Sequence, residues 1–250
     1  MLTGRLPLSA LFAALLVSPG LSAPAGKTEG ISPVARVISG TATGDLSVGQ
    51  DIFMGDTIAT GGSGHVQIRF ADRTRLVIGP ESELLISKYV TSGSGGAKSF
   101  AVNAVTGAFR FISGVSAKPA YKITTPTATI GIRGTRFDFG VRAAGRTYVL
   151  MFDGVARLCG SAGSCRDLDE LCELAGTNSR GEARLAQESD FLPRRGDLRR
   201  SFPYLSSQRS LNQDFRIATA RNCRDVTSAA PGSDTGDGSG EGGDSGGSNR

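Results

Sequence analysis

The sequence has no tryptophan and a single histidine, His65, among its 250 residues. One histidine excludes most catalytic triads and most protein metal sites, which rely on imidazole groups. The sequence also has no H-E-x-x-H segment and no C-x-x-C pair, so the patterns of zinc proteases and zinc ribbons are missing. His65 falls on an alternating stretch, where we expect a surface residue and not a general base. We therefore predict a protein that is not an enzyme and that needs no metal or other cofactor.

Paired carboxylates are the catalytic arrangement that the sequence leaves open. Asp138 and Asp153 could form such a pair, but the sequence does not give the distance between them. Asp153 precedes Gly154, which is typical of a turn.

Long helices and long apolar runs are missing too. Glycine supplies 35 residues, and each glycine inside a helix costs about 1 kcal/mol relative to alanine. The glycines follow no G-X-Y period, so a collagen is excluded as well. No stretch approaches the roughly 18 apolar residues of a membrane-spanning helix. These absences favour a chain of short β-strands without a transmembrane segment.

Residues 1–25 have the layout of a signal peptide. Arg5 gives a positive start, residues 6–17 are mainly apolar, and residues 23–25 form an A-x-A cleavage pattern with the cut after Ala25. We expect an exported mature protein, either periplasmic or secreted. An N-terminal membrane anchor is the alternative reading of the same stretch.

The four cysteines, Cys159, Cys165, Cys172 and Cys223, all lie in the second half of the chain. An even number in an exported protein predicts two disulfides, with three pairings to choose from. We favour Cys159–Cys165, which closes a short loop, and Cys172–Cys223, which ties the C-terminal segment back. A zinc site is the alternative, but the ligand spacing argues against it.

Charge is distributed unevenly along a chain whose formal net charge is +5. Residues 180–224 contain ten arginines and five acids, whereas residues 228–250 contain four acids, eight glycines and one arginine. The last segment cannot bury enough apolar surface to fold, so we expect a disordered tail. The arginines are not interleaved with stacking aromatics, and we expect no nucleic-acid partner. An anionic surface of the cell envelope suits the basic segment better.

Residues 64–78 carry the clearest strand pattern of the sequence. Val66, Ile68 and Phe70 alternate with polar residues, which is the period of a half-buried strand. A three-residue loop at 71–73 places every apolar side chain of residues 64–78 on one face. Arg73 then stands where such loops usually have a glycine, which predicts some strain or a different turn.

This register places Arg69 directly opposite Arg75 on the outer face. Like charges across a hairpin repel each other, so we hypothesise a binding site for an anion or an acidic partner at these two residues. The alternative is that nearby acids such as Asp72 or Glu81, or water, neutralise them.

Further strands are predicted from short β-forming runs that are separated by turn residues. Their spacing of roughly 8–12 residues is typical of a sandwich, a barrel or an irregular solenoid. After residue 158 the pattern weakens, and we expect helical turns at 167–175 and an amphipathic helix at 206–221. The predicted strands cover residues 34–38, 57–60, 84–90, 100–105, 108–112, 121–124, 128–133, 136–141, 147–152 and 154–158.

Residues 124–137, Thr-Thr-Pro-Thr-Ala-Thr-Ile-Gly-Ile-Arg-Gly-Thr-Arg-Phe, form the most specific segment. Pro126 cannot donate to a β-ladder and marks a strand start or edge, while Gly131 and Gly134 suggest a bulge or a close backbone approach. The segment resembles the signature of the FecR family, named for an iron-dicitrate signal regulator. Residues 48–61, 66–78, 76–84 and 153–155 resemble other parts of that family's pattern, although Arg73 replaces its usual glycine. The matching motif residues, which we interpret as mainly structural, are Thr125, Pro126, Gly131, Arg133, Gly134, Thr135 and Phe137.

The resemblance implies an all-β fold, either solenoid-like or a twisted β-sandwich. We expect a FecR-type β domain at 34–158, a disulfide-linked extension with some helix at 159–227, and the tail at 228–250. In signalling members of the family, such a domain is a periplasmic sensor that is coupled across the membrane to a sigma-factor-binding segment. We see no such segment here, so the resemblance extends to the module and not to sigma-factor regulation.

The function that these observations favour is a non-catalytic interaction module of the bacterial cell envelope, for protein–protein contact or signal sensing. The alternative is binding of an anionic envelope polymer, a glycan or lipid headgroups, through arginine-rich surfaces. The lack of tryptophan weakens the glycan reading, because sugars stack on aromatic rings.

Overall fold

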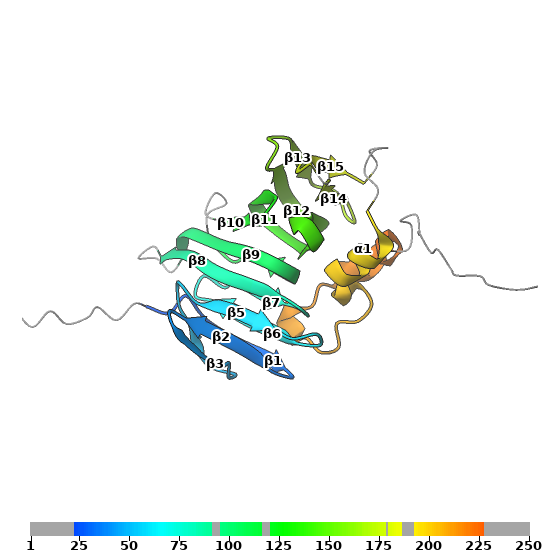
Figure 1. Cartoon of the computed structure of the whole chain (residues 1–250). Helices are drawn as coiled ribbons and strands as arrows, with labels where there is room; N and C mark the ends of the chain where they lie inside the picture. The colour runs from blue at the N-terminus through cyan, green and yellow to red at the C-terminus, as the bar shows by residue number, and fades with distance from the viewer. Residues whose placement is uncertain (1–22, 92–95, 117–120, 179, 187–192, 228–250) are drawn as a thin grey trace, which may run out of the picture.

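The computed structural model describes residues 23–91, 96–116, 121–178, 180–186 and 193–227. The predicted C-terminal tail and all but the last three residues of the predicted signal peptide lie outside these ranges. The fold is built mainly of strands, which confirms the all-β prediction (Figure 1). The strands are β1 (Gly26–Ser32), β2 (Ala35–Ser39), β3 (Ala42–Asp45), β4 (Asp51–Ile52), β5 (Thr57–Thr60), β6 (His65–Phe70), β7 (Arg75–Ile78), β8 (Glu83–Thr91), β9 (Ala97–Ile112), β10 (Tyr121–Thr124), β11 (Ala128–Val141), β12 (Thr147–Gly160), β13 (Cys165–Leu168), β14 (Leu174–Thr177) and β15 (Ala183–Leu185).

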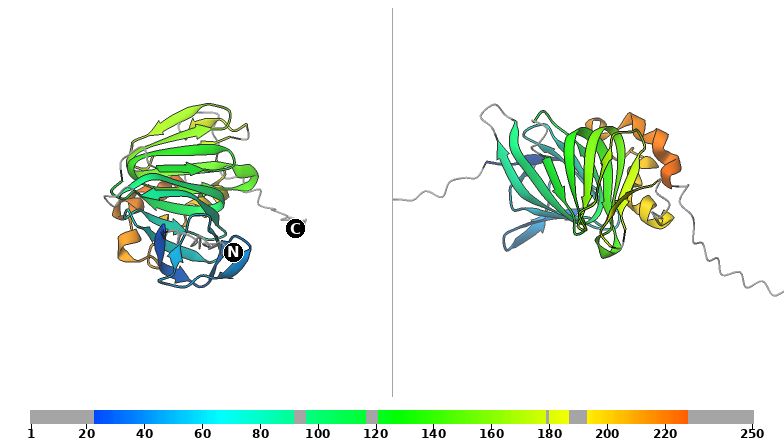
Figure 2. Two further views of the ribbon diagram at one scale, coloured as in Figure 1. Left: turned by 90° about the vertical axis from the view of Figure 1, so that its left-hand side faces the viewer. Right: turned by 90° about the horizontal axis from the view of Figure 1, so that it is seen from above.

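Three long strands, β9, β11 and β12, each take part in two layers of a twisted β-sandwich. β9 bonds to β8 and β10 along its first half, and to β7 and β11 along its second half. The first layer has the strand order β3-β2-β5-β8-β9-β10-β11-β12-β13, and the second has β4-β1-β6-β7-β9-β11-β12-β14-β15. The two layers are therefore one continuous sheet folded over itself (Figure 2).

Glycines with positive φ lie where the long strands bend from one layer into the other. The φ angles are +119° at Gly107, +66° at Gly134 and +86° at Gly154. A Cβ atom at Gly154 would lie 2.2 Å from the carbonyl oxygen of Gly134, so no side chain fits at this corner. Each of these three long strands was predicted from the sequence as two separate runs. The runs are 100–105 and 108–112 for β9, 128–133 and 136–141 for β11, and 147–152 and 154–158 for β12.

The main core lies between the two layers. Phenylalanines from both layers fill its centre, and the rings of Phe109 and Phe139 stack with centroids 4.7 Å apart. Phe137, from the predicted family motif, is fully buried among them. Further core side chains include Ile58, Ile68, Ile86, Phe100, Phe111, Ile130, Val149 and Leu158.

A C-terminal extension, residues 193–227, packs across the outer face of the second layer (Figure 1). It contains one short helix, α1 (Arg195–Ser201), and three short 3-10 segments, η3 (Pro203–Leu205), η4 (Gln213–Phe215) and η5 (Ala218–Thr227). Leu198, Phe202, Leu205 and Ile217 cover Tyr148, Leu150 and Phe152, while Tyr204, Leu211 and Phe215 cover Val77.

Small residues on the second layer make room for this extension. Gly140 pairs with Ala108, and a Cβ atom at Gly140 would lie 2.3 Å from the side chain of Ser201. At Gly79 an added Cβ would lie 3.0 Å from the hydroxyl oxygen of Tyr204 in the extension. The extension can therefore approach the sheet backbone only because these positions lack side chains.

Two helix predictions are wrong. Residues 206–221 form 3-10 turns instead of an amphipathic helix, because serines and Asn212 disfavour helix and the side chain of Gln208 bonds both backbone groups of Ile217, at 2.8 and 2.9 Å. Residues 167–175 contribute to β13 and β14 and not to helical turns. The sheet itself runs from Gly26 to Leu185, beyond the predicted 34–158 domain at both ends.

The disulfides pair as predicted. Cys159–Cys165 joins neighbouring residues of β12 and β13, and Cys172–Cys223 ties the extension to the sheet. In the described part of the chain, no helix is both long enough and apolar enough to cross a membrane.

Candidate functional site

The predicted hairpin is formed by β6 and β7, and it places Arg69 opposite Arg75 as expected. Arg73 has a φ of +66°, which fits the strain predicted at that position. The acids that meet Arg69 come from far away in the sequence: Glu29 of β1 and Asp214 of the extension. Arg69 Nη2 donates to Asp214 Oδ2 over 2.7 Å, and Arg75 Nη1 donates to the Asp214 carbonyl oxygen over 2.7 Å.

Electrostatics at the hairpin follow from these contacts. Hydrogen bonds to Glu29, and secondarily to Asp214, raise the pKa of Arg69. Burial lowers the pKa of Arg75, and repulsion from Arg69 acts in the same direction. The hairpin therefore meets an acidic group of its own chain, and binding of an external anion at Arg69 and Arg75 stays a prediction.

An ion pair without exposed surface lies under the extension. Arg110 of β9 and Asp138 of β11 face each other in the register, and Arg110 Nε lies 2.7 Å from Asp138 Oδ1. The rings of Phe152 and Tyr204 lie 5.6 and 5.2 Å from the guanidinium carbon, and Gln208 accepts a further hydrogen bond from Arg110. Burial raises the pKa of Asp138, and the Arg110 charge opposes this shift.

This ion pair was not predicted from the sequence, although its signal was present. Arg110 stands between Phe109 and Phe111, and Asp138 stands between Phe137 and Phe139. A lone charge within an otherwise apolar strand points to a partner on the facing strand. Because Arg110 also donates to the Gln208 side chain and to the Phe215 carbonyl oxygen, the pair anchors the extension to the sheet.

The catalytic arrangements considered from sequence do not form. Asp153 is exposed and pairs with Arg136, whereas Asp138 is buried against Arg110. His65 was expected at the surface, but the structure buries it to 6% exposure because the outer face of β6 is covered. Burial lowers its pKa. Among the described residues, no group of three or more histidine, cysteine and acidic side chains could hold a metal ion.

The predicted motif divides into two sets of residues. Thr125, Gly134, Thr135 and Phe137 hold the fold: the Thr125 hydroxyl lies 2.6 Å from that of Thr147, and the Thr135 hydroxyl donates to the Asp153 carbonyl over 2.6 Å. Pro126 precedes β11 and would contact a side chain at Gly145. Gly131 and Arg133 belong to the other set.

Gly131 and Arg133 lie on the outer face of the first layer. A row of paired residues crosses this face from β8 to β13, with Gly131 near its centre. Gly131 pairs with Lys122 on one side and Arg157 on the other, and nothing lies closer than 4.0 Å to a Cβ atom built at Gly131. We call the whole set the cationic row: Lys88, Ala101, Lys122, Gly131, Arg157 and Asp167.

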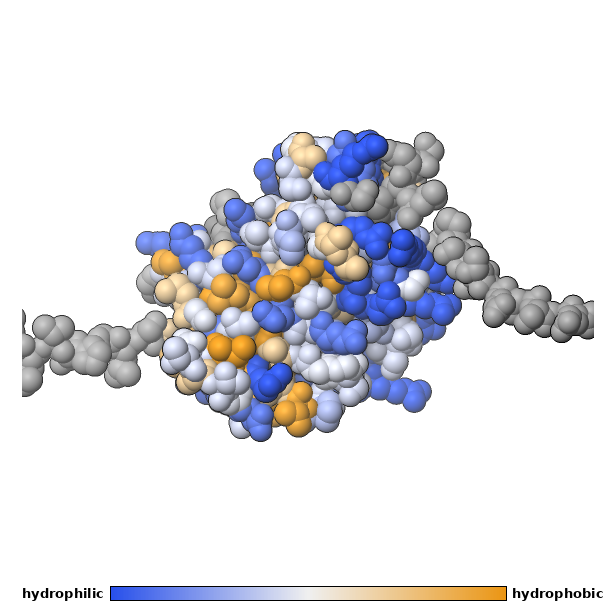
Figure 3. Space-filling model, in the orientation of Figure 1, coloured by the Kyte–Doolittle hydropathy of each residue, from blue (hydrophilic) through white to orange (hydrophobic). Residues whose placement is uncertain are grey.

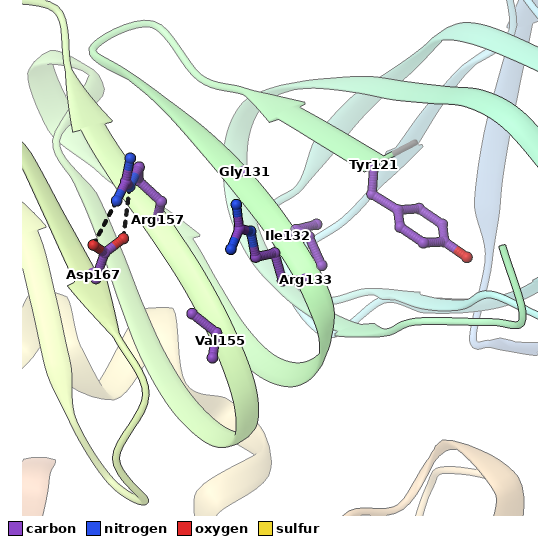
Figure 4. A pocket seen from close by; sticks show the side chains of 7 residues that line it. All are labelled: Tyr121, Gly131, Ile132, Arg133, Val155, Arg157 and Asp167. Carbon is purple, nitrogen blue, oxygen red and sulfur yellow. Dashed lines mark hydrogen bonds and ion pairs between the residues drawn. The ribbon is translucent and has the colours of Figure 1, made fainter. Parts of the chain in front are cut away.

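A hollow of about 560 Å³ lies beside the cationic row (Figure 4). Arg133, Val155, Arg157 and Asp167 line it, and their side chains project from three neighbouring strands. Arg157 holds Asp167 through two hydrogen bonds of 2.6 Å, which lower the pKa of that carboxyl. Arg133 is exposed and forms no ion pair with any described acid.

The other half of the same face is more apolar. Ile38, Thr57, Leu85 and Asn103 follow one another across β2, β5, β8 and β9. Ile38 and Leu85 are half-buried, while Val90 and Val105 are 42% and 47% exposed. Figure 3 shows hydrophobic residues gathered over these strands and hydrophilic residues over the extension.

The burial pattern separates the two faces. Residues 107–112 of β9 are buried on both sides, whereas residues 97–104 alternate between buried and partly exposed. The second layer is thus covered by the chain itself. The outer face of the first layer keeps accessible side chains, apolar on one half and basic on the other.

Arginines of the extension act mainly within it. Arg216, Arg221 and Arg224 line a second hollow of about 450 Å³. Their Nε atoms donate to the carbonyl oxygens of Leu211, Ala218 and Leu205. These contacts brace the 3-10 turns.

The fold defines a class of protein: a disulfide-containing β-sandwich module in which the C-terminal extension covers one outer face. Residues 56–157 match the sequence model of the family described as FecR protein, which confirms the resemblance predicted from the motifs. No protein of curated function matches the chain. Two crystal structures of a protein described as a "putative anti-sigma factor" from Parabacteroides distasonis ATCC 8503 are similar, each at 18% identity, with TM-scores of 0.43 and 0.42. Each match covers 53% of this chain and 59% of the other, so the matched region spans less than two thirds of those proteins.

Proposed function

We propose that the chain is an exported, non-catalytic interaction module of the cell envelope, which binds a protein partner through the outer face of the first layer. The observation that carries the proposal is the asymmetry of the sandwich. The extension buries one outer face, and the opposite face presents apolar and basic side chains in two adjoining halves. Protein interfaces combine apolar and polar groups in this way.

Export is supported by the two disulfides and by the A-x-A pattern before Gly26. Disulfides persist in oxidising compartments and are rare in the cytosol. The FecR match of residues 56–157 supports a role in sensing or relaying a signal, since family members of that kind are periplasmic sensors.

The proposed function is tested in cells by crosslinking the tagged protein and identifying its partners by mass spectrometry. We expect one protein partner at constant stoichiometry. Leu85→Glu and Arg133→Glu both alter the outer face of the first layer, and we expect each to reduce the yield of the crosslinked partner. Arg209→Glu, an exposed position on the extension, is the matched control and keeps it.

Binding of an anionic polymer is the second candidate, favoured by the exposed Lys122, Arg133 and Arg157. Binding of a polyanion falls steeply with salt, whereas a mixed apolar and basic interface is less sensitive. If only glycan or lipid were recovered, and if every arginine variant reduced that recovery equally, polymer binding would replace protein binding as the proposed function.

A further inference from the structure

Small residues and cations alternate along the cationic row. Ala101 lies between Lys88 and Lys122, and Gly131 lies between Lys122 and Arg157. Each small residue therefore leaves a notch with a positive charge on both sides. Ala101 and Gly131 are two strands apart, which corresponds to about 10 Å at the usual spacing of strands.

Most of the cationic side chains at these notches are not neutralised by an ion pair within the described part of the chain. Lys88 and Lys122 form no ion pair within the described part of the chain, and both are exposed. Arg157 already holds Asp167, but Arg133 lies one step along β11 from the Gly131 notch and is unpaired among described residues. The chemistry that fits is a pair of carboxylates about 10 Å apart.

The sequence contains such carboxylates after the extension. Asp234 and Asp237 are three residues apart, and so are Glu241 and Asp244. In an extended polyproline-type conformation, residues three apart lie on the same side at a spacing of about 9 Å. The residues between and around them are glycine, serine and threonine, which are small enough to lie against a sheet.

We propose that the cationic row binds the acidic segment 234–244 of the same chain, with one carboxylate in the Ala101 notch and one in the Gly131 notch. Asp244 follows Thr227, the last described residue of the extension, by 17 positions. That length reaches on the order of 55 Å when extended, whereas the two layers of a sandwich lie only about 10 Å apart. The segment can therefore pass round the edge of the sandwich to the first layer.

Tethering makes weak contacts sufficient. Exposed ion pairs are individually weak, but a short linker gives the segment an effective concentration in the millimolar range. The segment has no apolar side chain, so it leaves the apolar half of the face free. An acidic partner would then have to displace it, which makes the segment a competitor at the proposed interface.

A carbodiimide experiment tests the contact directly, because EDC joins a lysine amine to a carboxylate only where they touch. The chain has only five lysines, so crosslinked tryptic peptides of the purified full-length protein are easily assigned. We expect Lys88 and Lys122 to link to Asp234, Asp237, Glu241 or Asp244 at low salt. The yield should fall about fivefold or more in 0.5 M NaCl, where the screening length is only a few ångströms.

Matched controls are available on the same strands. Lys98 lies near the start of β9, at a register irregularity outside the cationic row, and should stay unlinked. Lys27 and Asp51, 3.6 Å apart, should link in every sample and report that the reagent works. Exchanging neighbours by Gly236→Asp with Asp237→Gly, and Gly243→Asp with Asp244→Gly, keeps the composition but changes the spacing from three to two. This variant should lose most of the Lys88 and Lys122 links.

Three results would overturn the proposal: equal linking of Lys98, unchanged yield in the spacing variant, or links formed only between labelled and unlabelled copies in a mixed-isotope sample. The purified sample contains no partner. A negative result therefore leaves the proposed function standing, and a missing partner in cells leaves this contact standing.

Discussion

Asp214 of the extension binds Arg69 of the β6–β7 hairpin across 145 positions of sequence, with 2.7 Å between the carboxylate and the guanidinium group. The neighbouring Phe215 is fully buried, and its ring lies 5.9 Å from the Arg69 guanidinium carbon. Asp214, beside the buried Phe215, thus accepts hydrogen bonds from Arg69 and Arg75 on the outer face of the second layer. The chain supplies its own partner on this face, which directs the search for an external partner to the first layer.

The Arg69–Asp214 pair should contribute little to stability on its own. Asp214 is largely exposed, and exposed pairs contribute about 0.2–1 kcal/mol. A double-mutant cycle with Arg69→Gln and Asp214→Asn, followed by urea unfolding, should give a coupling energy in that range. A coupling of several kcal/mol would show that this contact, and not the apolar side chains, holds the extension.

Breaking the buried pair should have a much larger effect. Asp138→Asn leaves the Arg110 charge buried without its partner, and we expect a loss of about 3–5 kcal/mol in unfolding free energy. The double variant Arg110→Met/Asp138→Leu should recover much of it, since both charges are removed. Arg136→Gln breaks an exposed pair and is the control, with a change below about 1 kcal/mol. Equal losses for Asp138→Asn and Arg136→Gln would contradict the anchoring role.

Replacement by alanine should destabilise the fold at Gly154 of β12 but not at Gly131 of β11. Gly154→Ala places a Cβ atom 2.2 Å from a backbone oxygen at a φ of +86°, so we expect a loss of at least about 1–3 kcal/mol. Gly131→Ala meets nothing closer than 4.0 Å and should leave the unfolding free energy within about 0.5 kcal/mol. A fold that tolerates Gly154→Ala would contradict the strand bend described here.

His65 should make stability depend on pH. Burial lowers its pKa below the usual 6.5, so the unfolded chain takes up a proton at a higher pH than the folded chain. Its contribution to stability is therefore complete above pH 6.5 and is lost as pH falls through the lowered folded pKa. Urea unfolding between pH 7.5 and 5 should show this loss, and His65→Gln should remove that part of the slope. An unchanged slope in the variant would contradict the burial of the imidazole.

The sequence predicted the strands β2 and β5 to β12, the hairpin register and the favoured disulfide pairing, because all three depend on local pattern or on a small number of choices. Alternation at Val66, Ile68 and Leu76 determined the register. The local pattern could not show that residues 107–112 are buried on both sides, because the extension buries their outer side. The same cause explains the misplaced His65.

The candidate site was predicted only in part. Gly131 and Arg133 were found through their motif, but the cationic row joins residues from six strands, and only the register brings them into line. Arg69 and Arg75 were predicted from the register alone, but their acids, Glu29 and Asp214, come from other elements. Contacts between residues far apart in the sequence therefore could not be predicted from the local sequence pattern.

Site-specific photocrosslinking in cells determines whether the outer face of the first layer contacts the partner. A photoreactive phenylalanine analogue replaces Asn103, on the first layer, or Arg209, on the extension. We expect a discrete protein adduct from position 103, lost when Leu85→Glu is added, and little or none from position 209. An adduct from position 209 alone, or adducts of equal yield from both positions, would contradict the proposed interface.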